Sequence, residues 1–440
     1  MSQHPAAQPK SILRGHRAQV HTTAFVRKNQ RLASGDADGF VVLWDLTIMR
    51  PRAVWRAHTN AILGISDWTD DKIITHGRDN RLVVWKLTAD DESGMSTALP
   101  LDDSAPERPH PWILHILEVN TMNFCSFASC TIAPNAVLDE IFVAVPNTLK
   151  TEAVDIFQLP SQSRLHTIHL GDKTEEKGMV MSLSLFWRQE SLILAAAYES
   201  GLAVVAQLRQ NGSWDVLYNA QAHSQPVLSL DVSPSKDYFF TSGADAIIAK
   251  HPIPTPAMPI QRPQVEATKD NKRPGAPSRS SLSAALASET RPAATQKEPK
   301  PIVETQPLKI INTKHSGQQS LSIRSDGKIF ATAGWDSKVR VYSAKTMSEL
   351  AVLKWHSVGC FTVAFATLAS NPLPDQVDSN ASEAKEEVEA SVSKHDSTAM
   401  VPVSKVRELS VKDRRIKMAK EAHWLAAGGK DGNISLWDVY

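Results

Sequence analysis

The chain has 440 residues, and its 48 lysine and arginine residues balance 47 aspartate and glutamate residues. The formal net charge of +1 excludes a strong overall field that would attract nucleic acid or a membrane surface. Three cysteines, Cys125, Cys130 and Cys360, are too few for a disulfide scaffold and favour a reducing compartment. No stretch approaches about 18 consecutive apolar residues, and residues 1–10 carry no apolar run, so we predict neither a membrane span nor a secretion signal.

In chain order, the first strong pattern is LASGDADGFVVLWDL at residues 32–46, in which a Gly/Asp turn joins two β-prone runs. Such a pattern predicts a β-hairpin. The layout recurs, with an aspartate six residues before an aromatic residue in the pairs Asp38 and Trp44, Asp79 and Trp85, Asp336 and Tyr342, and Asp431 and Trp437. A histidine precedes each of these hairpins, and a repeat of about 40 residues is typical of WD40 propellers, which have four strands per blade.

This pattern resembles the WD-repeat family, and the resemblance implies a buried tetrad of loop histidine, strand serine or threonine, turn aspartate and strand tryptophan. By position, the complete tetrads are His16, Ser34, Asp38 and Trp44; His58, Thr75, Asp79 and Trp85; and His315, Thr332, Asp336 and Tyr342. Two partial tetrads are His223, Thr241 and Asp245, with His251 in place of the tryptophan, and His356, Asp431 and Trp437, with Ala427 in place of the hydroxyl residue. We interpret all of them as structural, because each buried polar atom can find a partner.

We therefore predict an all-β fold in which residues 1–440 form a single seven-bladed WD40 propeller. The predicted blades span about residues 16–55, 58–90, 112–160, 180–220, 222–254, 308–350 and 355–440. The last hairpin has no outer strand of its own, and the β-prone run at residues 11–15 has no blade. We expect residues 11–15 to lie beside that hairpin and close the ring, which removes an unpaired edge.

Several segments depart from the repeat. The third and fourth blades lack the Trp-Asp ending and are predicted from strand spacing alone. Residues 88–111, rich in Asp, Ser and Pro, predict a surface loop. Residues 256–306 have too few apolar side chains to fold, which predicts a disordered insertion between blades, and residues 369–420 predict a second, charged insertion. The ring can tolerate both, because the cost of closing a loop grows slowly with its length.

The sequence contains no phosphate-binding loop, metalloprotease motif or nucleophile elbow. We predict no catalytic residues, no cofactor and no metal site, since the tetrad histidines are spread around the ring and Cys125 and Cys130 form no CxxC motif. The basic run Lys405 to Lys420 is either a nuclear-localisation or nucleic-acid patch, or a solvated segment that balances the acidic half of its insertion. Lys269 to Pro274 is a further localisation candidate.

Three stretches carry a closer resemblance: ILRGH at residues 12–16 followed by RLASGDADG at 31–39, IITHGRD at 73–79, and LAAGGKDG at 425–432. With the degenerate middle blades and the two insertions, they resemble the fungal ASTRA-associated protein 1 family, relatives of the guanine-nucleotide-binding β-subunit-like propellers. The resemblance implies a nuclear, non-catalytic scaffold subunit of the ASTRA complex, linked to chromatin remodelling and to co-chaperone-assisted maturation of kinases related to phosphatidylinositol 3-kinase. It implies helical-repeat proteins, AAA+ ATPases and a kinase-related scaffold as partners of a monomeric propeller.

Two other functions stay open at this point. A histone or nucleic-acid reader would lose affinity steeply with added salt, although we expect neither direct nucleic-acid binding nor membrane binding. A ubiquitin-ligase substrate receptor would carry Trp-Asp-x-Arg at a blade end, whereas Trp44-Asp45-Leu46-Thr47 and Trp437-Asp438-Val439-Tyr440 lack the arginine. A G-protein β subunit would need an amino-terminal coiled coil, and residues 1–10 contain two prolines instead.

Overall fold

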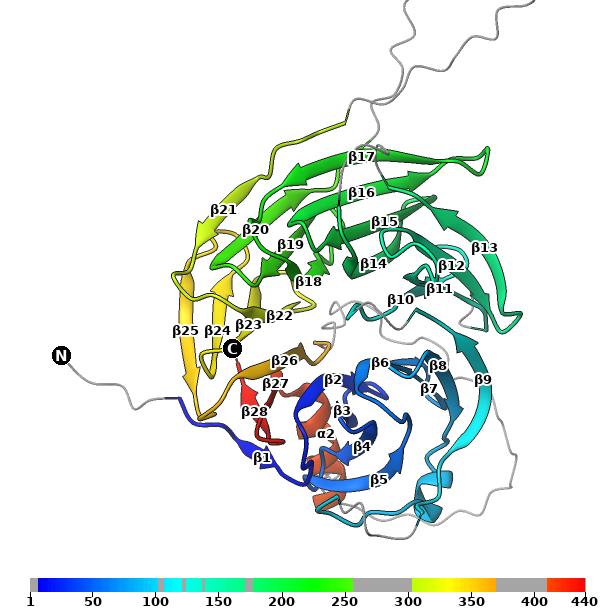
Figure 1. Cartoon of the computed structure of the whole chain (residues 1–440). Helices are drawn as coiled ribbons and strands as arrows, with labels where there is room; N and C mark the ends of the chain where they lie inside the picture. Colours follow the sequence, from blue (N-terminus) through cyan, green and yellow to red (C-terminus); the bar gives the residue numbers. More distant parts are fainter. Residues whose placement is uncertain are drawn as a thin grey trace, which may run out of the picture.

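The fold is a ring of β-sheets (Figure 1). A computed structural model describes residues 7–101, 107–120, 124–136, 139–170, 177–255, 303–368 and 410–439. Within these residues, seven four-stranded antiparallel sheets, the blades, follow one another around the ring. The predicted all-β, seven-bladed propeller is therefore confirmed.

The blades are numbered in ring order, and their strands are given from the innermost to the outermost. Blade one contains β2 (Val20–Val26), β3 (Arg31–Asp36), β4 (Phe40–Asp45) and β5 (Arg50–Arg56). Blade two contains β6 (Ile62–Thr69), β7 (Lys72–Gly77), β8 (Arg81–Lys86) and β9 (Trp112–Glu118). Blade three contains β10 (Ala128–Thr131), β11 (Ile141–Pro146), β12 (Val154–Leu159) and β13 (Ser163–Ile168).

The second half of the ring repeats this order. Blade four contains β14 (Val180–Arg188), β15 (Ser191–Tyr198), β16 (Leu202–Leu208) and β17 (Trp214–Gln221). Blade five contains β18 (Val227–Val232), β19 (Tyr238–Gly243), β20 (Ile247–Pro252) and β21 (Lys309–Asn312). Blade six contains β22 (Gln318–Ile323), β23 (Ile329–Gly334), β24 (Lys338–Ser343) and β25 (Glu349–Lys354). Blade seven contains β26 (Cys360–Phe365), β27 (Trp424–Gly429), β28 (Ile434–Asp438) and β1 (Ser11–Leu13).

The two ends of the chain close the ring together. Strand β1 pairs antiparallel with β28, placing Ser11 opposite Leu436 and Leu13 opposite Ile434. The main-chain N–H of Lys10 also donates to the Leu436 carbonyl at 2.7 Å. The predicted closing strand at residues 11–15 is confirmed, and it protects the outer edge of β28.

Two predicted blade boundaries are wrong. Strand β9, predicted as the first strand of a blade spanning 112–160, pairs with β8 and is the outer strand of blade two. Strand β21, predicted to open the blade spanning 308–350, pairs with β20 and completes blade five. Outer strands carry no Trp-Asp ending, and a long connection before them costs little, so the pattern could not assign them to the correct blade.

The predicted position of one insertion, and the predicted disorder of its end, are also wrong. Because β21 belongs to blade five, the insertion at 256–306 falls within that blade and not between blades. Its residues 256–302, like residues 369–409 of the second insertion, lie outside the described part of the chain. The prediction of disorder fails for the residues that follow: Glu304 forms a parallel bridge to Tyr218 of β17.

Residues 88–101 form a strap across blade one, where the sequence predicted a surface loop. The strap begins beyond β8 and contains the short 3-10 helix η1 (Asp91–Gly94). The Ser96 carbonyl accepts from the Val54 N–H of β5 at 2.8 Å, and the Leu101 N–H donates to the Gly15 carbonyl at 2.9 Å. Leu101 is buried in the apolar cluster that contains Leu13. The strap thus links blade two to the closing strand.

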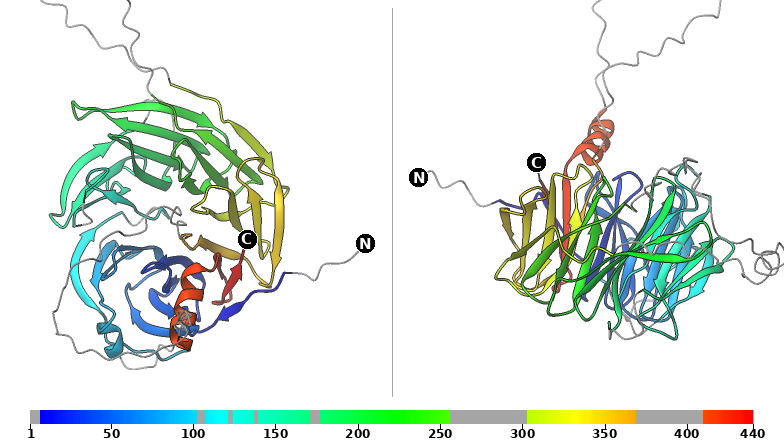
Figure 2. Two further views of the ribbon diagram at one scale, coloured as in Figure 1. Left: turned by 180° about the vertical axis from the view of Figure 1, so that it is seen from behind. Right: turned by 90° about the horizontal axis from the view of Figure 1, so that it is seen from above.

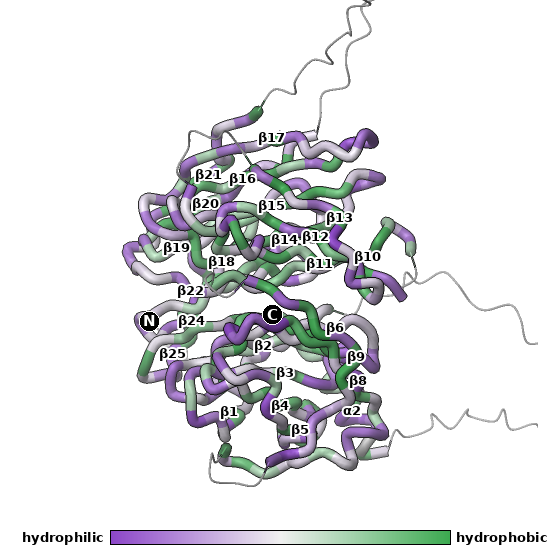
Figure 3. The backbone as a smooth tube through the Cα atoms, turned by 45° about the vertical axis from the view of Figure 1, so that its right-hand side comes forward, coloured by the Kyte–Doolittle hydropathy of each residue, from purple (hydrophilic) through white to green (hydrophobic). Residues whose placement is uncertain are grey.

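The core lies between neighbouring blades. In β4, Val41 and Leu43 pack with Ile62 of blade two, whereas Val42 and Trp44 pack with residues of blade seven such as Trp424. A strand buried on both faces reads as a continuous apolar run, which explains the sequence FVVLW at this point. Figure 3 shows such apolar runs along the strands inside the ring.

The ring has two faces. The loops that lead into each first strand and the turns between second and third strands lie on one face, which we call the tetrad face. The helix α2 (Val411–Glu421) projects from the opposite face (Figure 2). It is capped by Ser410, and its Ala419 carbonyl accepts from Trp424 Nε1 at 3.1 Å. The end of the predicted basic run is therefore helical.

Candidate functional site: side-chain networks and the face they hold

Blade two shows the regular form of the tetrad. His58, in the loop before β6, lies 2.8 Å from Asp79 through Nδ1 and 2.8 Å from Thr75 Oγ1 through Nε2. The Trp85 Nε1–H donates to the same hydroxyl at 2.8 Å. Burial alone would raise the pKa of Asp79, but hydrogen bonds from His58 and the Thr59 N–H hold it below its usual value. The ionised carboxylate orients the imidazole and ties the loop to the strands.

In blade one, the prediction of Asp38 as the tetrad carboxylate is wrong, and Asp36 takes that role. Asp36 is fully buried, its Oδ2 lies 2.7 Å from His16 Nδ1, and its Oδ1 accepts from two main-chain N–H groups of the turn. Ser34 Oγ lies 2.8 Å from His16 Nε2 and accepts from Trp44 Nε1 at 2.8 Å.

Local geometry explains the exchange of aspartates. Asp36 lies two residues after the tetrad hydroxyl, and the corresponding residue of blade two is Gly77. A Cβ at Gly77 would lie 2.4 Å from the ring of His58, so blade two reaches its histidine from further along the turn. In blade one, Asp36 is the last residue of β3 and contacts the histidine from there, whereas Asp38 lies exposed in the turn.

Blade five completes its network although it lacks tryptophan. His223 lies 2.9 Å from Asp245 and 2.8 Å from Thr241, as expected of those three residues. The sequence predicted that His251 leaves the tetrad incomplete, but His251 Nε2 lies 2.8 Å from Thr241 Oγ1 and its Nδ1 lies 2.8 Å from Tyr218 Oη. Burial lowers the pKa of His251 to about 3, so the ring is neutral. A neutral ring can donate to Thr241 and accept from Tyr218, so it replaces the indole donor.

Blade six was predicted to hold a complete tetrad and does not. His315 Nδ1 lies 3.7 Å from Asp336, and its side chain is 42% exposed. The Thr332 hydroxyl donates instead to Gln318 Oε1 at 2.6 Å. The buried Arg340 donates to both carboxylate oxygens of Asp336, at 3.1 and 2.5 Å. Because this two-point contact occupies Asp336, the histidine is displaced toward solvent.

Blade seven was predicted to lack the tetrad hydroxyl and to hold at most three members, but Ser435 supplies a hydroxyl. His356 Nε2 lies 2.9 Å from Ser435 Oγ, which also accepts from Trp437 Nε1 at 2.8 Å. His356 Nδ1 lies 3.5 Å from Asp431. Ser435 faces Ala427 across the β27–β28 pair, so the hydroxyl comes from the third strand and not from the second.

One register position explains the departures in blades six and seven. The residue facing the tetrad hydroxyl position is apolar in blades one, two and five, namely Val42, Val83 and Ala249. It is Arg340 in blade six and Ser435 in blade seven. A polar residue two positions before the strand aromatic was the signal that sequence reasoning missed.

Blade three has no tetrad but has a polar network of its own. Asp155 of β12 is buried and accepts from the side chains of Asn147 at 2.8 Å and Thr167 at 2.6 Å. Asn147 Oδ1 also accepts the N–H groups of Leu149 and Lys150. This carboxylate fastens the tetrad-face turn between β11 and β12 without a histidine.

On the tetrad face, Trp335 is 47% exposed and is oriented by two neighbouring residues. It lies in the turn between β23 and β24, and its Nε1–H donates to Gln319 Oε1 at 2.8 Å. Its ring rests on Gly317, where an added Cβ would lie 2.1 Å from ring atoms. Gly317 has a φ of +73°, a conformation that glycine adopts without strain.

A second aromatic group lies across the same face. Phe124, before β10, is 55% exposed, and the guanidinium carbon of Arg78 lies 4.3 Å from its ring centre. A channel of about 500 Å³ opens beside Phe124 and is lined mainly by the first strands of the blades. The His21 and Phe361 rings meet edge to face there, with centres 5.8 Å apart. The face therefore presents two exposed aromatic side chains, Phe124 and Trp335, and Phe124 lines the central channel.

The cysteine thiols are poorly placed for chemistry. Burial raises the pKa of Cys125, and it raises the pKa of Cys130 and Cys360 to about 12. Such thiols stay protonated at neutral pH, so they are weak nucleophiles and weak metal ligands. In the part of the chain that the structure describes, no three His, Cys, Asp or Glu side chains come together as metal ligands. No helix in that part is long and apolar enough to cross a bilayer.

The sequence of this chain is similar to those of a known protein family. The family model of ASTRA-associated protein 1 matches residues 9–437. ASTRA-associated protein 1 of Pyricularia oryzae is 48% identical over 482 residues, covering 99% of this chain and 97% of that protein. The Verticillium alfalfae protein of the same name is 49% identical over 436 residues (98% and 93%), and that of Schizosaccharomyces pombe is 35% identical over 392 residues (81% and 93%).

Proposed function

Since this chain belongs to the ASTRA-associated protein 1 family, we propose that it is a non-catalytic adaptor subunit of the ASTRA assembly. This role is linked to chromatin remodelling and to the co-chaperone-assisted maturation of kinases related to phosphatidylinositol 3-kinase. It binds helical-repeat proteins, AAA+ ATPases or a kinase-related scaffold without turning over a substrate.

The observation that best supports a binding role is Trp335, which is half exposed and oriented by a hydrogen bond to Gln319. A large aromatic ring that is already immobilised loses little conformational entropy on binding, which is why such residues dominate protein interfaces. The histidines and carboxylates of blades one, two and five, by contrast, are engaged with one another inside the blades. The face therefore has the properties of a docking surface whose polar groups are committed to holding its loops.

Quantitative co-purification of ASTRA subunits with Trp335→Ala and Phe124→Ala variants tests the role. We expect each variant to lose at least about tenfold of one or more subunits, as truncation of an interface hot spot does. Ile48→Ala is the matched control, because Ile48 is also half exposed but lies in the β4–β5 turn on the opposite face. Unchanged subunit recovery with both aromatic variants would contradict the proposal.

We further propose that the protein acts in the nucleus. Helix α2 supports this, because Arg415, Lys417 and Lys420 are exposed on it and belong to the basic run of the second insertion. Fluorescent fusions of the full chain, with these three residues changed to Gln, test the idea. Nuclear signal should fall while the melting temperature stays unchanged; a cytoplasmic wild-type fusion would refute the localisation itself.

A further inference from the structure

The outer strand of blade two has an edge that the described residues leave uncovered. Strand β9 ends the sheet order β6-β7-β8-β9. Among the described residues, no main-chain hydrogen bond reaches its outer side, and Gln162 of blade three touches only the His115 side chain. A strand edge of this kind presents N–H and C=O groups that can pair with another extended chain.

On two other blades, the protein covers part of the outer edge with its own main chain. On blade one, the Ser96 carbonyl of the strap accepts from the Val54 N–H of β5 at 2.8 Å. On blade four, Glu304 exchanges two hydrogen bonds of 2.9 Å with residues 217 and 219 of β17. Extended main chain therefore can occupy an outer edge of this propeller, as it does at β5 and β17, and β9 offers the same kind of site.

The side chains of β9 are unusually apolar for an exposed strand. Trp112 is 75% exposed, and Ile113 and Ile116 are also exposed. Solvated outer strands are normally protected by charged or short sequences. Here the exposed apolar surface runs along most of the seven-residue strand. Covering it would therefore release water from several adjacent side chains.

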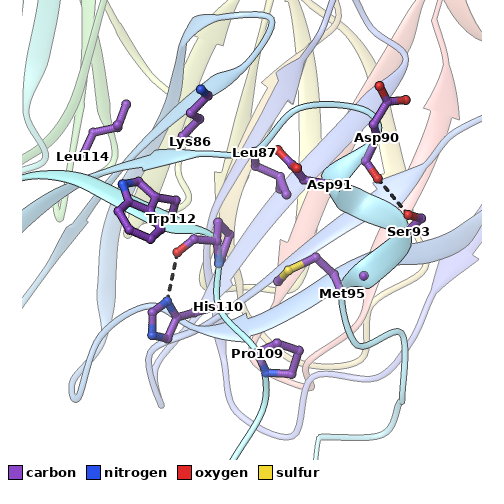
Figure 4. A pocket seen from close by; sticks show the side chains of 12 residues that line it. Lys86, Leu87, Asp90, Asp91, Ser93, Met95, Pro109, His110, Trp112 and Leu114 are labelled. Carbon is purple, nitrogen blue, oxygen red and sulfur yellow. Dashed lines mark hydrogen bonds between the residues drawn. The ribbon is translucent and has the colours of Figure 1, made fainter.

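A pocket of about 740 Å³ opens at the beginning of β9 (Figure 4). Trp112 and Leu114 lie along one side of it, and Met95, Asp91 of η1 and the preceding Asp90 lie along the other. Both carboxylates are exposed, and hydrogen bonds from Thr88 hold the pKa of Asp91 below its usual value. Lys86 also lines the pocket, so its rim carries two carboxylates against one lysine. The pocket thus combines an apolar wall with a rim of net negative charge that suits a lysine or arginine.

We propose that β9 is a docking edge for an extended segment of another protein, which adds a fifth strand to blade two. The segment places an apolar side chain against Trp112 and a lysine or arginine beside Asp90 and Asp91. Main-chain pairing supplies the register, and the pocket supplies the sequence preference. This surface is separate from the tetrad face, and the inference does not depend on membership of a particular assembly.

Selection of a displayed library of random 12-residue peptides on the full chain tests the proposal. We expect enriched peptides with alternating apolar residues and at least one lysine or arginine. Their affinity should fall at least tenfold with Trp112→Ser and severalfold with the double variant Asp90→Asn/Asp91→Asn. Leu350→Ser is the matched control, because Leu350 is a 57% exposed apolar residue on β25, the outer strand of blade six, and it should leave binding unchanged.

Two further measurements separate strand addition from other modes of binding. Hydrogen exchange should slow at the β9 amides when the selected peptide binds, and a peptide N-methylated at alternate residues should bind at least tenfold more weakly. Failure to enrich any peptide sensitive to Trp112→Ser, or binding without protection of β9, would overturn the proposal. So would sedimentation showing that wild-type chains self-associate and Trp112→Ser chains do not, since β9 would then be occupied by a second copy.

Discussion

Glu92 provides the sharpest test of how the strap supports the ring. Its carboxylate is fully buried and contacts Arg27, Arg31 and Arg52, with 3.0 Å to Arg31 Nη2 and 3.1 Å to Arg52 Nε. Arg27 is itself buried, and burial lowers its pKa while Glu92 opposes that change. Glu92→Gln would leave the Arg27 charge without its counter-charge, which in buried pairs costs about 3 to 5 kcal/mol.

The expected loss of unfolding free energy is at the lower end of that range. Arg52 is 42% exposed and Arg31 retains Asp45 at 3.3 Å, so both can remain solvated or paired. We therefore expect Glu92→Gln to reduce the free energy of unfolding by about 3 kcal/mol. The strap should also become more sensitive to proteolysis.

Denaturant unfolding of Glu92→Gln, Arg27→Met and the double variant measures this effect. If the two groups form one unit, the double variant should be less destabilised than the sum of the single variants, by about 1 kcal/mol or more. Asp70→Asn is the control, because Asp70 pairs with Lys28 at 3.3 Å on the exposed surface, where such pairs contribute little. A Glu92→Gln chain as stable as wild type, or an equally large effect of Asp70→Asn, would refute the reasoning.

Three further predictions concern single side chains. Asp36→Ala should lower the free energy of unfolding by about 2 kcal/mol or more, because it leaves buried donors unpaired, whereas Asp38→Ala at an exposed position should cost less than about 1 kcal/mol; equal costs in chemical denaturation would contradict the assignment. Ser435→Ala should cost about 2 kcal/mol, and adding Ala427→Ser should restore much of it, since Ala427 occupies the hydroxyl position of the other blades; melting of the three variants decides this. Burial raises the pKa of Asp231 from 3.8 to about 6, so the folded state binds its proton more tightly, and stability should fall as pH rises from about 4 to 6; an Asp231→Asn chain should lack this slope in pH-dependent unfolding, and identical slopes would exclude the effect.

The repeat pattern predicted five of the seven blades because its signals lie close together in the sequence, and strand spacing predicted the other two. A Gly/Asp turn, a run such as FVVLW and an upstream histidine each lie within one repeat, so their recurrence specifies the same local structure several times. The pairing of residues 11–15 with the last hairpin could also be predicted, since an unpaired edge at one end and an unassigned strand at the other have one simple solution. The blade-two tetrad is the one that the resemblance to WD-repeat proteins implied.

Tertiary structure decided which polar side chains become partners, because these residues do not lie at fixed intervals in the sequence. Asp36 replaces Asp38 because of where His16 lies, Arg340 captures Asp336 from the facing strand, and Ser435 supplies a hydroxyl that Ala427 lacks. A buried polar group takes the partner that its three-dimensional surroundings place within about 3 Å, whichever repeat position that partner occupies. The strap follows the same principle: its Asp, Ser and Pro residues predict a loop, and only the three arginines of blade one, gathered around Glu92 by folding, turn that loop into part of the ring's closure.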